Sequence, residues 1–289
     1  MSKHWLIDPA HLREAVVKLR TVAAAAAVGG DRREAAIAAR GTVPKAKGGI
    51  AVIPLHGVIV PRADEFDEFF GLIGLTSWLP RVEQAVADDA VGGVVLDIDS
   101  PGGMVDGVPE AAARLFALRG NKPIVAVANT LAASAAYWIG TAADKLFVTP
   151  SGEVGSIGVV SMHMDYSAML EADGIDVTIF TAGKYKAEFT PYKPLTDAAK
   201  AHEQGVIEDI YGEFVAAVAK HRGVPASRVR SDYGEGRVVA AKPAVAAGMA
   251  DGVRSLAEVI AGMQGEAASR GRKAEARRAW ARHRMGVAT

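Results

Sequence analysis

The sequence predicts an α/β fold in which a mainly parallel sheet is flanked by helices. Apolar, β-branched runs alternate with segments of helical period over residues 50–183, an order typical of βαβ units. Two of these runs, at 91–100 and 123–130, are rich in apolar residues, as buried strands of parallel sheets are. Glycines close the helical segments, as at position 120, where a helix commonly ends.

The first half of this region supplies the predicted elements in order. Residues 50–60 (IAVIPLHGVIV) form a β-branched run broken by glycine, which predicts a strand pair or a bent strand. Residues 91–100 predict a buried strand that ends at SPGG, and 107–120 a helix. Residues 123–130 predict a third strand, and NTLAASAAYWIG (129–140) leads from it into a helix.

The second half continues the alternation up to a long amphipathic helix. After this long helix, residues 238–253 predict a short helix and a strand. The other predicted elements are strands at 145–150, 156–164 and 176–183, and helices at 165–174, 196–222 and 255–263.

Three regions follow from this pattern. Residues 1–48 predict an Ala-rich helical extension, with one or two helices within 1–29, and then a polar linker. Residues 49–263 form the α/β domain. Residues 264–289 hold seven Lys or Arg and two Glu and predict a basic tail, either a solvated helix or a disordered end.

Composition excludes several classes of protein. The chain has no cysteine, so disulfide scaffolds, thiol nucleophiles and thiolate metal sites are all absent. The formal net charge is zero, which gives no bulk signal for nucleic acid. No signal peptide and no apolar run of membrane-spanning length is recognised, so we expect a cytoplasmic protein. No cofactor or metal motif is recognised either, and we expect a reaction that needs none.

Ser134 stands alone in an apolar stretch, between a predicted strand and a predicted helix. The simplest interpretation is a helix N-cap, a position that serine favours. The alternative is a nucleophile, because the first-turn amides of a helix point outward and the Ala135 amide would then stabilise an oxyanion. Two glycines in DSPGG (99–103), after the preceding buried strand, would let the backbone approach a ligand closely and supply further amides.

A serine nucleophile needs a base, and the residues leave two routes open. His163 lies in the same α/β stretch, with Asp165 nearby. The lysines of GKYK (183–186) offer the other route, provided that an apolar site lowers the lysine pKa toward neutrality.

Together these motifs resemble the signal-peptide-peptidase A family of serine peptidases, which has the Clp/crotonase-type fold. The resemblance covers about residues 50–263 and implies a Clp/crotonase-like ββα spiral. The matching pieces, in chain order, are IPLHGVI, DSPGG, AASAAYW, TAADKLFVTPSGEVGSIGVV, GKYK and GRVVAAKPAVAAGMADGV.

The resemblance also implies roles for individual residues. Ser134 matches the family nucleophile and Lys186 the general base, whereas Lys184 is less favoured because the family lysine closes this turn. Ser156 matches a serine that orients the lysine.

The oxyanion hole would consist of the amide of Gly102 or Gly103 together with that of Ala135. The sequence departs from many members at Ala135–Ala136, where glycines commonly follow the nucleophile.

Within the family, SMHMDYS and KYKAEFTPYKPL resemble the phage or prophage capsid-maturation peptidases, which act on scaffold and head proteins. This implies peptide or unfolded protein substrates, a host-cytoplasmic or prohead location, and a ring-like homo-oligomer whose serine and lysine come from neighbouring subunits. The basic tail would then be a docking arm for scaffold, capsid protein or nucleic acid.

Four alternatives remain. A cellular signal-peptide-peptidase-like enzyme would degrade membrane-derived peptides. A Clp-like enzyme would use a Ser134–His163–Asp triad. A crotonase-like acyl-CoA enzyme is disfavoured, because no acidic pair flanks SPGG or ASAAYW. A non-catalytic assembly protein is disfavoured by the intact serine and lysine motifs.

Overall fold

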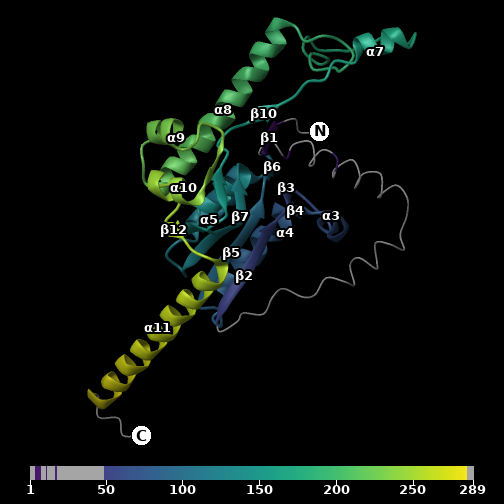
Figure 1. The fold of residues 1–289 in the computed structure, drawn as a ribbon. Helices are drawn as coiled ribbons and strands as arrows, with labels where there is room; N and C mark the ends of the chain where they lie inside the picture. The colour runs from purple at the N-terminus through teal and green to yellow at the C-terminus, as the bar shows by residue number, and fades with distance from the viewer. Residues whose placement is uncertain (1–3, 8–10, 12–16, 18–48, 285–289) are drawn as a thin grey trace.

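Two β-sheets form the body of the protein in a computed structural model, which describes residues 4–7, 11, 17 and 49–284. The larger sheet has seven strands and the smaller has five. Helices α8 (Asp197–Arg222) and α11 (Leu256–Arg284) project from opposite ends of this body (Figure 1).

The larger sheet is mainly parallel, which confirms the predicted α/β class. Its path is β11-β9-β7-β5-β2, with β8 paired to β7 and β12 paired to β8. The β2/β5, β5/β7, β7/β8, β7/β9 and β8/β12 pairs are parallel, and β9/β11 is antiparallel. The strands are β2 (Ile50–His56), β5 (Gly93–Ser100), β7 (Ile124–Ala133), β8 (Lys145–Val148), β9 (Glu153–Gly155), β11 (Val238–Ala240) and β12 (Gly252–Val253).

Both faces of this sheet are covered because its strands are apolar on both. Leu96 packs into the main buried cluster, and its neighbour Val95 into a second cluster that includes Val259 of α11. Among the helices that contribute side chains to the main cluster, four cover one face of the sheet, while α11 covers the other. These four are α4 (Leu75–Ala87), α5 (Val108–Ala117), α6 (Ala135–Thr141) and α8.

The smaller sheet follows the order β10-β1-β6-β3-β4. Its β3/β4 and β3/β6 pairs are parallel, whereas β1 is antiparallel to both β6 and β10. The strands are β1 (His4–Ile7), β3 (Val58–Val60), β4 (Leu72–Gly74), β6 (Gly102–Met104) and β10 (Val160–Ser161). The remaining helices are α3 (Glu65–Phe69), α7 (Ser167–Ala172), α9 (Ala226–Asp232) and α10 (Ala241–Ala247).

The predicted helix at the start of the chain is wrong for residues 4–7. These residues form β1, because two open strand edges accept their backbone groups. The rest of the predicted extension and linker lies almost wholly outside the described residues. At the other end, one helix, α11, runs across position 263 and contains both the predicted closing helix and the described part of the basic tail.

The strand predicted at 176–183 is also wrong. This segment has no regular structure, and the side chain of Phe180 is 91% exposed. Alternating apolar residues become a strand only where a neighbouring edge completes the ladder, and the described part of the chain supplies none here. The strand predicted at 156–164 is reduced to Val160–Ser161.

Candidate functional site

Ser134 lies on a sharp turn between β7 and α6. Its backbone angles are φ 54° and ψ −117°, in a region that non-glycine residues rarely occupy. The Ser134 amide donates to the Gly155 carbonyl at 2.7 Å, and the Ser134 carbonyl accepts from the Trp138 amide at 2.9 Å. Strand pairing on one side and the first helical hydrogen bond on the other therefore hold the strained turn.

The Ser134 hydroxyl does not cap the helix. It makes no capping hydrogen bond, the residue is fully buried, and Oγ has no hydrogen-bond partner among the described residues. Buried polar atoms are nearly always paired, so an orphaned hydroxyl on a strained turn indicates a functional position. The geometry thus disfavours the N-cap interpretation.

Gly102 lies against the start of α6. Its φ is +99°, and a Cβ at this position would come within 3.1 Å of the Ala135 amide nitrogen and 3.0 Å of the Ala133 carbonyl oxygen. The Gly102 amide donates to Ser100 Oγ at 3.1 Å. The fold therefore brings together the backbone of Gly102 and Ala135, two of the residues predicted to form an oxyanion hole.

Gly103 follows within β6, between β1 and β3. A Cβ there would overlap the Ile59 carbonyl oxygen at 1.8 Å. Only glycine allows β3 and β6 to approach this closely, so this second glycine has a clear packing role beside any role of its amide.

Ser156 lies next to this site at the end of β9. It is 3% exposed, has φ 54°, and its amide donates to the Arg237 carbonyl at 2.8 Å. Ala133 of β7 pairs with Gly155 of β9. Ser134 and Ser156 are the residues that come next after this pair, one on each strand. The tertiary structure thus places these two serines side by side although 22 positions separate them.

Lys186 does not reach Ser134 within one chain. It is exposed, and its amide donates to the Gly183 carbonyl at 3.1 Å, in a turn without regular structure. The segment that contains α7 lies beyond the N-terminal end of α8, away from both sheets (Figure 1). Since Ser134 Oγ is unpartnered, no hydrogen bond joins it to Lys186.

His163 is not bonded to Ser134 either. Its ring meets Phe189 edge-on at a centroid distance of 5.7 Å, and its Nε2 atom has no hydrogen-bond partner in the described part of the chain. Neither of the two predicted bases is therefore in place in the isolated chain.

A polar cluster at the carboxyl ends of the central strands was missed by the sequence interpretation. His56 Nε2 lies 3.0 Å from Asp97 Oδ2, and Asn129 Nδ2 donates to Asp97 Oδ1 at 3.0 Å. The hydrogen bond to the Asp97 carboxylate raises the pKa of His56 above its ordinary value, against the opposing effect of burial. The signal for this cluster was the pair Asp97 and Asp99 ending an apolar strand, because polar groups at this end of a parallel sheet often bind ligands.

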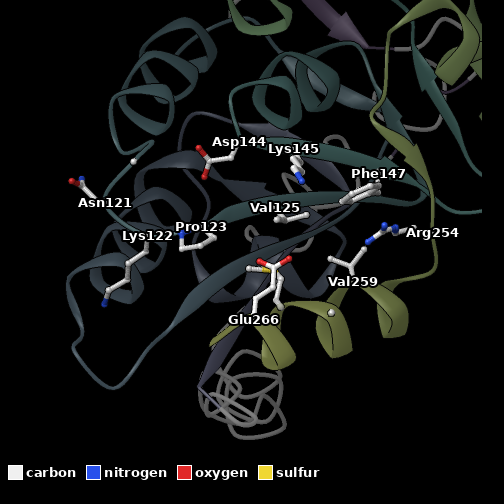
Figure 2. Close-up of a pocket in the computed structure, with 13 residues that line it drawn as sticks. Asn121, Lys122, Pro123, Val125, Asp144, Lys145, Phe147, Arg254, Val259 and Glu266 are labelled. Atoms are coloured by element: carbon white, nitrogen blue, oxygen red, sulfur yellow. The ribbon is translucent and has the colours of Figure 1, made fainter. Parts of the chain in front are cut away.

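The cavity drawn in Figure 2 is a separate feature. Its volume is about 330 Å³, and its lining includes Pro123, Asp144, Lys145, Arg254 and Glu266. Pro123 precedes the first residue of β7 and Ser134 follows the last, so the cavity lies at the opposite end of this strand from the serine. A second cavity of about 380 Å³ lies beside α8 and is lined by residues 157–159, directly after Ser156.

Replacing Ser134 by glycine is expected to stabilise the fold relative to Ser134→Ala. Both variants lack the hydroxyl, but only glycine adopts φ 54° without strain. We expect Ser134→Gly to exceed Ser134→Ala in unfolding free energy by about 1 kcal/mol, measured by urea denaturation. Equal stabilities, or a more stable alanine variant, would show that the turn is not strained.

Comparisons with known proteins identify a peptidase family. The model of peptidase family S49 matches residues 117–270. The chain is 32% identical over 216 residues to capsid assembly protease C of Escherichia phage lambda, covering 75% of this chain and 49% of that protein. It is 33% identical to head-tail preconnector protein GP5 of Enterobacteria phage P21, covering 74% of this chain and 42% of that protein.

A third relative is a putative signal peptide peptidase of Enterococcus faecium, 31% identical over 61% of this chain and 51% of that protein. The chain thus spans about half the length of the curated relatives it matches. Among the described residues, no helix combines the length and the apolar character that crossing a bilayer requires. The family model matches more than half of the chain, which shows that this chain belongs to peptidase family S49.

Proposed function

We propose that the protein is a serine endopeptidase with a Ser134–Lys186 dyad that processes scaffold or capsid proteins during phage head assembly. One observation carries the chemistry: the Ser134 hydroxyl is buried, unpartnered and held on a strained turn beside the backbone of Gly102 and Ala135. A strained turn of this kind presents a nucleophile directly to a substrate carbonyl, with backbone amides at hand for the oxyanion.

The reaction proceeds in two halves. Ser134 Oγ attacks the scissile carbonyl carbon while Lys186 Nζ, neutral at this moment, takes the hydroxyl proton. The amide of Ala135, with that of Gly102 or Gly103, holds the oxyanion of the tetrahedral intermediate. The protonated lysine then gives its proton to the leaving amine as the peptide C–N bond breaks. A water molecule, deprotonated by the same lysine, attacks the acyl carbon, and the lysine returns the proton to Ser134 Oγ as the ester bond breaks.

Lys186 comes from a neighbouring subunit in this proposal. The segment around it exposes many large apolar side chains, a pattern that marks an interaction surface rather than a solvated one. They are Met162, Met164, Met169, Ile175, Val177, Phe180, Tyr185 and Tyr192. A second copy covering this surface would bury Lys186, and burial favours the neutral form of an amine, which a base must have.

Ser156 completes the arrangement as a positioning residue. It is buried beside Ser134, and we propose that its hydroxyl accepts a hydrogen bond from an incoming lysine. That bond would direct Nζ toward Ser134 Oγ.

The biological role is inferred from the relatives named for capsid assembly and head-tail preconnection. Residues 49–263 would act as the peptidase domain, within the host cytoplasm or the prohead. The extension at 1–48 and the basic stretch at 264–289 would flank it, and the latter would dock onto scaffold or capsid protein, or onto nucleic acid.

A fluorophosphonate probe tests the nucleophile directly. We expect one probe molecule per chain, located on Ser134 by peptide mass spectrometry, because only an activated serine reacts with such a reagent. Ser151→Ala, which alters an exposed serine in a nearby turn, should label like the unaltered protein. Labelling that persists in Ser134→Ala would place the nucleophile elsewhere.

A further inference from the structure

The N-terminal strand β1 lies between the strand that contains the oxyanion glycines and the strand that follows Ser156. It is antiparallel to both, with Leu6 opposite Gly103 and Ile7 opposite Gly102 on one side. On the other side, His4 is opposite Ser161. Extended peptides bind proteins by adding a strand to open sheet edges in this way, and here two edges flank one strand.

The backbone of β1 reaches the predicted oxyanion hole. A Cβ at Gly102 would lie 2.1 Å from the Leu6 carbonyl oxygen and 3.1 Å from the Ala135 amide nitrogen. The Leu6 carbonyl oxygen and the Ala135 amide nitrogen therefore lie on the same side of Gly102 and near each other. The carbonyl of a peptide about to be cleaved would have to occupy the position of the Leu6 carbonyl.

The side chains of β1 fill the interior on both faces of the small sheet. Leu6 is fully buried and belongs to the main cluster that contains Ala135 and Ala136. Trp5 and Ile7 point the other way, into the cluster with Val58 and Val60. The gap between β6 and β10 therefore accepts a strand with large apolar residues.

A polar contact fastens the outer end of β1. His4 Nε2 lies 3.0 Å from Glu203 Oε1 on α8, and Ser161 of β10 donates to the same carboxylate oxygen. Glu203 therefore joins β1, β10 and α8 at one point, largely sheltered from solvent.

We propose that the gap between β6 and β10 is the substrate cleft and that residues 4–7 are its tethered occupant. This rests on the proposed peptidase function and names its substrate class: an extended segment with a leucine-sized apolar residue on the acyl side of the scissile bond. Residues 4–7 act as an intramolecular competitor, so substrates gain access to Ser134 only when β1 leaves the cleft.

The experiment separates the strand from the chain after folding. A recognition site for a sequence-specific protease is inserted within residues 41–46, in the stretch that the sequence predicts as a linker, and the folded protein is cut. A tethered segment competes at an effective concentration in the millimolar range, which cutting and dilution abolish. With a fluorogenic peptide that contains Trp-Leu-Ile, we expect the apparent KM to fall at least about tenfold and kcat to stay within about twofold.

Adding a synthetic peptide of residues 1–12 should restore the high KM, whereas the same peptide with Leu6→Asp should not.

A second variant avoids removing buried residues: His4→Ala in the full chain loses the contact with Glu203 and should lower KM by about two- to fivefold. The matched control is His202→Ala, which alters an exposed histidine on α8 beside Glu203. An unchanged KM after cutting and in His4→Ala would overturn the proposal.

A binding measurement distinguishes this proposal from the proposed function. Fluorescein-labelled residues 1–12 are titrated into cut Ser134→Ala protein that has been freed of its own strand, and anisotropy is recorded. Saturable binding, abolished by Leu6→Asp, supports occupancy of the cleft even if Ser134 catalyses nothing. Activity that depends on Ser134, combined with no binding of this peptide, overturns the tethered strand and leaves the peptidase assignment standing.

Discussion

Ser134→Ala is expected to lower kcat for peptide cleavage by about four orders of magnitude or more, with little change in KM. In the proposed mechanism the hydroxyl oxygen is the attacking atom, and loss of a nucleophile from a coupled nucleophile–base pair removes nearly all of the chemical catalysis. Its removal leaves no hydrogen bond unsatisfied, because Oγ has no partner among the described residues. The protein should therefore stay folded and bind substrate while the rate collapses.

Single-turnover kinetics on an apolar fluorogenic peptide measure this effect, and circular dichroism confirms that the variant is folded. Anisotropy with a labelled substrate checks that binding is retained. A residual kcat within about tenfold of the unaltered protein would exclude Ser134 as nucleophile.

Lys186→Met is expected to be as inactive as Ser134→Ala, and co-expression of the two variants should restore activity. In the proposed mechanism, each variant alone lacks one half of every dyad. If the halves come from different subunits, an assembly that mixes the two variants contains intact pairs. Random mixing should recover about a quarter of full activity, since an active site needs its serine from a Lys186→Met copy and its lysine from a Ser134→Ala copy, each with a chance of about one half.

Tagging the two variants differently and purifying doubly tagged assemblies makes this test quantitative. Lys184→Met is the matched control, because it removes a lysine from the same turn, and it should keep most of the activity. Mixed assemblies that remain inactive would overturn a dyad shared between subunits. A larger loss in His163→Ala than in Lys186→Met would favour the histidine as base.

The sequence was informative wherever structure depends on neighbouring residues. The helix at 196–222 begins and ends as predicted, because its period, its Thr196 cap and its terminal Gly223 are all encoded locally. The turn at Ser134 was predicted for the same reason, since an apolar strand, a serine and an apolar helix follow one another directly. The SPGG turn likewise lies at the end of its strand.

The sequence was misleading where an element depends on a distant partner. Residues 176–183 have the pattern of a strand, but the described chain offers no edge to pair with them. Residues 4–7 precede an Ala-rich stretch that suggests helix, yet they complete a sheet with residues about 100 and 160 positions away. Period and propensity cannot specify such pairings, because these depend on which edges the rest of the fold leaves open.

By itself, the sequence determined the α/β class and the positions of Ser134 and SPGG at the ends of buried strands, since buried periodicity is a property of short segments. The tertiary structure alone decided that Ser156 lies beside Ser134, that Lys186 remains exposed in a single chain, and that β1 fills the gap beside Gly102. The physical reason is that strand edges and buried surfaces are completed by whichever segment can reach them, and this is settled only when the whole chain has packed.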